Sequence, residues 1–222
     1  MARPSAAACP CLRAEAGGCN LRRGRGEVLG ELEGYPMRSL VFALAAAAAV
    51  LMSPAALAAP IDIGPAVGTK APALTATDAA GSPASMKDLA GPRGLVLVFV
   101  RSARWCPFCQ AQLIDLRGAQ EALKAKGYGL AALSYDSPEV LAQFAARRDI
   151  GYPLLSDPKS ATIDAYGIRD PQYPAGHMAH GVPQPAIFIL SRDGVVQAKL
   201  AEEGYRNRPP TAVVLETVSR LP

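Results

Sequence analysis

An unbroken apolar run at residues 95–100 (LVLVFV) leads directly into a stretch that holds the motif Cys-Pro-Phe-Cys at residues 106–109. Such a run is typical of a strand whose two faces are both covered, so it predicts a central strand of a sheet. Beyond the motif, apolar residues recur at helical spacing over residues 110–126, and Gly127 provides a stop. A covered strand, a cysteine pair and an amphipathic helix in this order favour a fold in which helices cover a sheet.

The rest of the chain continues the alternation of strands and helices. Residues 71–81 predict a hairpin, because apolar and small polar residues alternate before the turn-forming sequence Asp-Ala-Ala-Gly. Further strands are expected at residues 128–135, 152–158, 185–190 and 195–200, and helices at residues 137–149, 160–166 and 210–221. This order predicts an α/β fold, a three-layer sandwich with a central mixed sheet flanked by helices.

Residues 37–58 have the composition of a secretory signal peptide. They combine a short basic start, an apolar middle over residues 40–51, and a small-x-small site that ends at Ala58. We therefore expect cleavage after Ala58 and a periplasmic location. The alternative is an anchor retained in the membrane, because residues 40–59 have about the 20-residue length that a bilayer requires.

The segments on either side of this signal complete the expected domain organisation. Residues 1–36 are rich in Ala, Gly and Arg without apolar periodicity, which indicates a disordered or mis-annotated leader. Translation is then expected to start at Met37. Residues 59–70 are interpreted as a linker, and residues 71–222 as the folded domain.

The cysteine content points to a reactive pair. The chain has five cysteines, and Cys106 and Cys109 are the two that follow the expected cleavage point. In an oxidising compartment such a close pair contributes little as a structural staple, because closing a short loop removes little chain entropy. We therefore predict that this pair is used chemically.

The charge of the chain excludes one class of partner. The formal net charge is +4, and acidic and basic residues are interspersed along the sequence. No basic face is apparent, so no nucleic-acid partner is expected.

The position of the motif between a strand and a helix suits thiol chemistry. It places Cys106 at the helix N-cap and Pro107 at the first helical position, where the missing N–H costs nothing. The helix dipole and the unpaired N–H groups of the first turn then stabilise a thiolate on Cys106, and Arg101 and Arg104 add to this if they point toward the sulfur. We predict that Cys106 attacks and that Cys109 is the resolving thiol.

Two other interpretations of the pair stay open. A zinc half-site would need further ligands, and His177 and His180 are the other soft ligands after the expected cleavage point. An inert buried pair is the second. Because a strand-to-helix CxxC without a second CxxC favours redox chemistry, we predict neither a metal nor a cofactor.

Residues 71–200 resemble the alkyl hydroperoxide reductase / thiol-specific antioxidant family, a peroxiredoxin-like redoxin branch of the thioredoxin superfamily. The segments that carry the resemblance are APALTATDAAGSPASMKDLAG, LVLVFVRSARWCPFC, LAALSYDSPEVLAQFAARRDIGYPLLSD and GVPQPAIFILSRDGVV. The resemblance implies a thioredoxin-like sheet flanked by helices, which agrees with the order of elements above, and an antioxidant redox activity.

The site residues depart from the family's pattern. Peroxiredoxins typically carry Pro-x-x-x-Thr-x-x-Cys, and an Arg three residues before the Phe of a later strand; these groups bind the peroxide and stabilise the thiolate. Aligning the reactive Cys with Cys109 places Ser102 at the Pro, Cys106 at the Thr and Pro185 at the Arg. The CxxC and Pro185 instead resemble thioredoxins, which implies a cis proline whose neighbouring backbone is free to pair with an extended substrate.

Further candidate residues follow from this resemblance. Trp105, Pro107, Phe108 and Pro185 are expected to shape the substrate contact. His180 is a candidate proton relay or, with both sulfurs, a copper ligand; a solvated loop histidine is the alternative. No proton acceptor for Cys109 is apparent, because Val100 occupies the position of the buried carboxylate of thioredoxins.

The sequence therefore favours an exported thiol–disulfide oxidoreductase that uses the CPFC pair. Its expected partners are protein thiols and disulfides or a reductant redoxin, and a membrane only if the leader is retained. The first alternative is a thiol-dependent peroxidase, in which one cysteine attacks a hydroperoxide and the other closes the disulfide. The second is a copper-binding redoxin-type chaperone. The absent Thr and Arg count against the peroxidase, and the absent Cys-x-x-x-Cys counts against the chaperone.

Overall fold

The computed structural model describes residues 60–222. The leader, the start at Met37 and the signal peptide lie outside this range and stay predictions. Within the described range, no helix combines the length and the apolar character that crossing a membrane requires.

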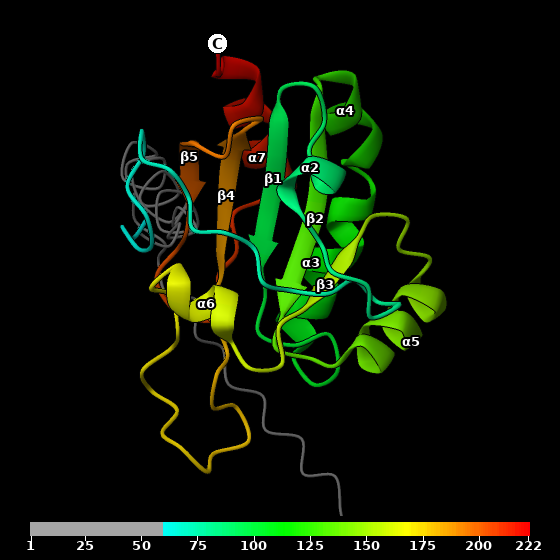
Figure 1. Ribbon diagram of the computed structural model, residues 1–222, viewed down its shortest axis with the longest axis vertical. Helices are drawn as coiled ribbons and strands as arrows, with labels where there is room; N and C mark the ends of the chain where they lie inside the picture. Colours follow the sequence, from blue (N-terminus) through cyan, green and yellow to red (C-terminus); the bar gives the residue numbers. More distant parts are fainter. Residues whose placement is uncertain (1–59) are drawn as a thin grey trace, which may run out of the picture. The chain divides into compact units, whose positions relative to one another are not determined.

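A five-stranded sheet forms the centre of the domain, in the order β3-β2-β1-β4-β5 (Figure 1). Strand β1 pairs in parallel with β2 and antiparallel with β4, so the sheet is mixed, as predicted. The pairing is parallel between β2 and β3 and antiparallel between β4 and β5. The strands span Gly94–Phe99 (β1), Tyr128–Ser134 (β2), Leu154–Ser156 (β3), Ala186–Ser191 (β4) and Val196–Leu200 (β5).

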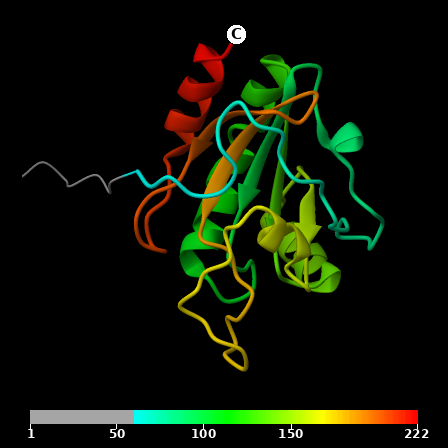
Figure 2. The ribbon, with the colours of Figure 1, turned by 60° about the vertical axis from the view of Figure 1, so that its left-hand side comes forward.

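Helices cover both faces of this sheet, and Figure 2 shows α7 on one side and α6 on the other. Side chains of β1 alternate between two apolar cores, as the period of a strand requires. One core contains Val96 and Val98 and residues of α3, α4, α5 and α7, and the other contains Leu95 and Leu97 and residues of α6. The helices span Met86–Leu89 (α2), Pro107–Arg117 (α3), Gln120–Ala125 (α4), Pro138–Arg148 (α5), Ala161–Ala165 (α6) and Thr211–Arg220 (α7). The predicted three-layer α/β architecture is confirmed.

Two local predictions were wrong. The helix expected over residues 110–126 is interrupted after Arg117, where the N–H of Gly118 bonds to Asp115 O (3.1 Å) and that of Ala119 to Leu116 O (3.0 Å). Glycine favours such a break because it gains little from a helical conformation. The hairpin expected over residues 71–81 is reduced to isolated bridges of Thr77 with Pro83 and Ser156, although the turn itself forms.

The segment interpreted as a linker lies along the sheet in the described range. The N–H of Ile61 donates to Ala201 O (3.0 Å), and that of Gly68 donates to Val196 O (2.8 Å). Lys199 on β5 also donates to the carbonyls of Ile63 and Pro65. These bonds tie the start of the described chain to the edge strand β5.

Candidate active site

The cysteine pair lies where the sequence analysis placed it, at the junction between the central strand β1 and helix α3. Cys106 is the N-cap of α3 and Pro107 is its first residue. A disulfide joins Cys106 and Cys109, whose Cα atoms are 5.2 Å apart. Both side chains are buried, and the N–H of Cys109 donates to Cys106 Sγ (3.3 Å). The structure thus holds the pair in its oxidised form at the N-terminus of α3.

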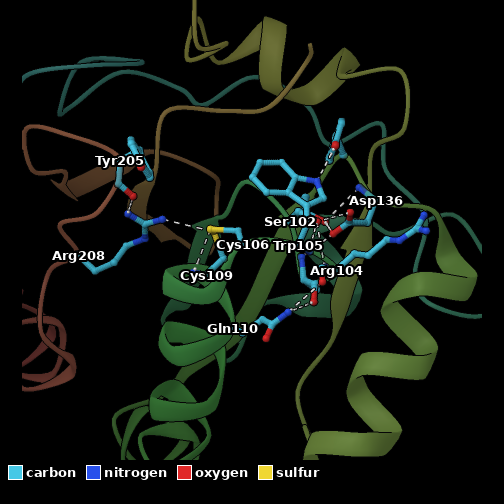
Figure 3. Close-up of a disulfide and its surroundings, with 12 residues drawn as sticks. Ser102, Arg104, Trp105, Cys106, Cys109, Gln110, Asp136, Tyr205 and Arg208 are labelled. Atoms are coloured by element: carbon cyan, nitrogen blue, oxygen red, sulfur yellow. Dashed lines mark hydrogen bonds between the residues drawn. A yellow bond between two sulfur atoms is a disulfide. The ribbon is translucent and has the colours of Figure 1, made fainter. Parts of the chain in front are cut away.

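A guanidinium group reaches the second sulfur from a distant part of the chain. Nη2 of Arg208 lies 3.3 Å from Cys109 Sγ, across a sequence separation of 99 residues (Figure 3). Arg208 belongs to the segment between β5 and α7, and it is held by donation to the carbonyls of Tyr205 and Asn207. Burial, reinforced by the nearby charge of Arg101, lowers the pKa of Arg208 to about 10. The cation is thus kept in a partly desolvated place, where its field on the sulfur is strong.

A buried carboxylate fixes the loop that leads into the motif. Asp136, just after β2, accepts hydrogen bonds from Ser102 Oγ (2.7 Å), the N–H of Ala103 (2.6 Å) and Ser134 Oγ (2.9 Å). Burial raises the pKa of Asp136, and the three hydrogen bonds and the charge of Arg104 oppose this rise. Figure 3 shows Asp136 and Ser102 together beside Trp105. The Asp136 carboxylate therefore holds the approach to Cys106 in place.

Aromatic rings surround the first residue of this loop. The guanidinium of Arg101 lies over the rings of Trp105 (5.2 Å), Tyr173 (4.8 Å) and Tyr205 (4.6 Å). Trp105 in turn donates from Nε1 to the hydroxyl of Tyr135 (2.9 Å). These contacts join four loop segments near the cysteine pair.

The expected substrate-contact residues occupy different environments. Phe108 is exposed and packs edge-on against Tyr205, with ring centroids 6.1 Å apart, and Trp105 is half-buried. Pro185 is buried directly before β4. The structure thus presents Phe108 to solvent beside the disulfide and covers Pro185.

The cis bond expected before Pro185 is absent: all peptide bonds in residues 60–222 are trans. The backbone before Pro185 is occupied by the protein's own chain: Gln184 N–H donates to Ile168 O (2.7 Å), and Pro183 bridges to Arg169. The edge that an extended substrate would use in a thioredoxin is thus already paired.

The side chain of His180 is engaged away from the sulfurs. Its Nδ1 contacts Tyr173 O (2.9 Å) and its Nε2 contacts Arg169 Nη1 (3.3 Å). The N–H of Ala179 donates to Nδ1 of His177 (3.0 Å). None of these contacts involves a sulfur of the cysteine pair, and the described residues hold no group of three or more His, Cys, Asp and Glu side chains that could bind copper.

A mixed five-stranded sheet with a disulfide at the N-terminus of its first long helix defines a thioredoxin-like thiol redox protein. The model of the AhpC/TSA family matches residues 67–199, and the chain therefore belongs to that family, as its resemblance implied. The chain is 33% identical over 129 residues to a putative peroxiredoxin of Mycobacterium tuberculosis, which covers 58% of this chain and 80% of the relative. It is 28% identical over 130 residues to peroxiredoxin Bcp of Escherichia coli, with 59% and 81% covered.

Solved structures support the same fold. The peroxidoxin BcpB of M. tuberculosis superposes with a TM-score of 0.60 at 21% identity, over 71% of this chain and 97% of that chain. The bacterioferritin comigratory protein of Xanthomonas campestris, reported for its alkyl peroxide reduction activity, superposes with a TM-score of 0.53 at 19% identity, over 66% and 90%. The chain is thus a peroxiredoxin-like redoxin with a CxxC disulfide.

Arg208, Tyr205 and Asp136 were not predicted from the sequence as site residues. A cluster of arginines in the segment YRNRPP, directly before α7, was the available signal for Arg208. Nothing in the local pattern of this segment indicates that it returns to the end of β1. For Asp136 the available signal was a carboxylate shortly after the buried strand β2. Because β2 runs parallel to its neighbour β1, the residues that follow β2 lie at the same edge of the sheet as the motif that follows β1.

Proposed function

We propose that this chain is a thiol peroxidase that reduces a hydroperoxide with its cysteine pair. The carrying observation is the guanidinium of Arg208 at Cys109 Sγ, the position that aligns with the reactive cysteine of the family. A cation at this sulfur favours the thiolate over the thiol, and the thiolate is the nucleophile. Family membership and the peroxiredoxin relatives support this function better than the disulfide exchange that the sequence favoured.

In the proposed reaction the Cys109 thiolate attacks the terminal oxygen of the hydroperoxide. An S–O bond forms and the O–O bond breaks, the sulfur is oxidised to a sulfenic acid, and the leaving alkoxide takes a proton to become an alcohol. Cys106 then attacks the sulfenic sulfur, an S–S bond forms, and water leaves. An external thiol reductant returns two electrons and two protons to the disulfide.

The surroundings of the two sulfurs support this division of roles. Cys109 has the guanidinium, which stabilises a negative charge on the attacking sulfur. Cys106 lies one helical turn away, in the disulfide observed, so the second step needs no unfolding of α3. This assignment reverses the order inferred from the sequence, where Cys106 attacks first.

Disulfide exchange is the second candidate. It is supported by the N-cap position of Cys106, whose Sγ accepts the N–H of Cys109, and by the exposed ring of Phe108 beside it. In that reaction Cys106 attacks a partner disulfide and Cys109 resolves the mixed disulfide. The paired backbone before Pro185 counts against it, since a substrate strand would have to displace Ile168 from Gln184.

Single cysteine variants of the full chain test the proposal. Reduced Cys106→Ser treated with one equivalent of hydroperoxide should consume it and carry a dimedone adduct on Cys109, located by peptide mass spectrometry, because its sulfenic acid has no partner. Cys109→Ser should consume hydroperoxide far more slowly. If Cys106 carries the adduct instead, or if wild type exchanges disulfides rapidly and leaves hydroperoxide intact, the peroxidase assignment is wrong.

The reductant and the cellular location stay open to proposal. We place the reaction in the periplasm on the composition of residues 37–58. We assign the reducing role to a thiol redoxin, because reduction of the disulfide consumes two thiols and a dithiol protein supplies both from one molecule.

A further inference from the structure

Arg101 is a buried cation whose partner the described residues do not supply. It is 3% exposed, and its Nε is buried without a hydrogen-bond partner in residues 60–222. None of the ion pairs in that range includes it. Buried charges are normally paired or hydrogen-bonded, because removing a charge from water is costly. A buried guanidinium of this kind would be stabilised by an anion that the described residues do not supply.

Aromatic rings account for part of its stabilisation. Cation–π contacts with Trp105, Tyr173 and Tyr205 hold the guanidinium at 4.6–5.2 Å from the ring centroids. Such contacts leave the in-plane N–H groups without acceptors, because the rings offer their faces. The arrangement orients the guanidinium and keeps its donors available to a planar acceptor such as a carboxylate.

A second arginine with an unused donor lies beside it. Arg208 is close enough for the Arg101 charge to lower its pKa, and its Nε is also buried without a partner in the described range. Its Nη atoms serve Cys109 and nearby carbonyls. Glu202 acts on Arg208 in the opposite direction, but it forms no ion pair with either arginine. Both arginines thus contact Tyr205, Arg101 through the ring and Arg208 through the backbone carbonyl, and each has a buried Nε without a partner in the described range.

We propose that Arg101, together with Nε of Arg208, binds the carboxylate of the small molecule that reacts with the cysteine pair. This inference rests on the proposed thiol redox function and adds the class of substrate: a molecule with its reactive group on one side and a carboxylate on the other. In this proposal a guanidinium nitrogen of Arg208 contacts the reacting sulfur, and Arg101 binds the carboxylate at the other end of the ligand.

A cavity lies beside Arg208. This cavity of about 400 Å³ is lined by Phe108, Gln112 and Arg208 and also by Asp115 and Glu202, whereas Arg101 does not line it. The Oε1 atom of Gln112 is buried without a partner in the described range. Phe108 offers an apolar wall for a carbon skeleton. Arg101 is 3% exposed, and of the three rings around it that of Tyr205 is the most exposed, at 37%, so a ligand would reach the guanidinium by displacing this ring.

The carboxylate could belong to either of two reactants. In the oxidative half-reaction it is part of a hydroperoxide, which undergoes the steps given above and leaves as an alcohol. In the reductive half-reaction it is part of a thiol: its thiolate attacks the disulfide and releases one cysteine as a thiolate, and a second thiolate then forms the external disulfide and frees the other cysteine. Both reactants share the carboxylate that Arg101 would hold.

A binding measurement tests the site without turnover. Trp105 is the single tryptophan of the chain and contacts Arg101, so its fluorescence reports on the guanidinium. The oxidised full chain is titrated with 4-isopropylbenzoate and with the uncharged 4-isopropylbenzamide. We expect a saturable change with the carboxylate and none with the amide. Arg101→Gln should lose it, whereas Arg147→Gln, the same charge change on the exposed face of α5, should keep it.

Kinetics identify the reactant that carries the carboxylate. As oxidants, cumene hydroperoxide is compared with its para-carboxylated analogue. As reductants, 3-mercaptopropionamide is compared with 3-mercaptopropionate, and the rate at which each thiol reduces the protein is divided by the rate at which it reduces a small-molecule disulfide. We expect wild type to prefer the carboxylated member of one pair by about 10- to 100-fold, since contacts with charged groups have this magnitude. Arg101→Gln should abolish the preference for the carboxylated member, and Arg101→Lys should restore part of it.

Each possible result either supports or refutes the carboxylate site. No preference in either pair, or an equal loss for charged and uncharged members in Arg101→Gln, overturns the anion site and identifies Arg101 as a structural cation. Carboxylate binding without hydroperoxide consumption keeps the site and refutes the peroxidase. If Arg101→Gln does not fold, the proposal is tested by two other measurements. One is the binding of 4-isopropylbenzoate and 4-isopropylbenzamide to wild type, and the other is the preference of Arg101→Lys for the carboxylated reactant.

Discussion

Replacing Arg208 with Gln should slow the oxidation of the reduced protein by hydroperoxide. Nη2 of Arg208 lies 3.3 Å from Cys109 Sγ in the disulfide, and on reduction the same contact becomes a charge-assisted hydrogen bond to a thiolate. Such bonds contribute about 1.5–3 kcal/mol. Because about 1.4 kcal/mol corresponds to a factor of ten, losing the bond lowers the thiolate population about 10- to 150-fold. A more basic thiolate is a better nucleophile, with a Brønsted coefficient of about 0.4–0.5, so the rate should fall at least about threefold.

Stopped-flow fluorescence of the full chain measures this rate, with Trp105 as the reporter of disulfide formation. Reduced wild type, Arg208→Gln, Arg208→Lys and the control Arg147→Gln are each mixed with hydrogen peroxide at several pH values. The gap between wild type and Arg208→Gln should narrow as pH rises, because the thiol then ionises without the guanidinium. Arg208→Lys should lie between them, since a lysine keeps the charge but loses the planar fork.

A separate measurement distinguishes a change in chemistry from a change in folding. Burial lowers the pKa of Arg208 to about 10, which shows that keeping this group charged is costly in the folded protein. The oxidised Arg208→Gln protein should therefore melt no lower than oxidised wild type. If it melts normally and oxidises within about twofold of the wild-type rate across the pH series, Arg208 does not stabilise the reacting thiolate, and the reasoning fails.

Two further predictions concern the loops that hold the site. Burial raises the pKa of Asp136 in the folded protein above its value in the unfolded chain. Between these two pKa values the folded state binds the proton and the unfolded state does not. The contribution of this carboxyl to the free energy of unfolding therefore falls as the pH rises through that interval. Urea unfolding of wild type and Asp136→Asn across mildly acidic pH should show that slope in wild type alone, and parallel curves would contradict it. Tyr135→Phe removes the acceptor of Trp105 Nε1–H and the donor to Met178 O. It should lower the free energy of unfolding by about 1 kcal/mol and speed proteolysis near Met178, and an unchanged cleavage rate there would show that the bond does not hold this loop.

The fold was predictable to the extent that its elements are periodic. The run at residues 95–100 is buried on both faces in β1, and the predicted strands at residues 128–135 and 185–190 lie beside it. Where a helix or hairpin depended on one or two residues, prediction failed. The break after Arg117 depends on a local choice between two backbone hydrogen-bond patterns, and the spacing of leucines on either side does not encode it.

The cysteine pair was predictable because its chemistry and its structural position are both local. Strand, CxxC and helix follow one another, so the N-cap position of Cys106 and the first-turn position of Pro107 could be inferred from neighbours alone. Arg208 and Asp136 act on the same site from later segments. Their approach depends on the order of strands in the sheet and on the course of the chain after β5, which no local pattern specifies.

The three departures from the peroxiredoxin pattern acquire a different meaning in the structure. Ser102, in place of Pro, donates to Asp136 and so fixes the loop before the motif. Cys106, in place of Thr, is disulfide-bonded to Cys109. Pro185 replaces the expected Arg, and Arg208 brings a guanidinium to the sulfur from another segment. A comparison by alignment counts each as a loss, because it assumes that a group must come from a fixed position in the chain. The proposed peroxidase chemistry requires only that a second thiol and a cation lie at the attacking sulfur and that the loop before the motif is fixed; the fold places Cys106 and Arg208 at Cys109, and Asp136 fixes that loop.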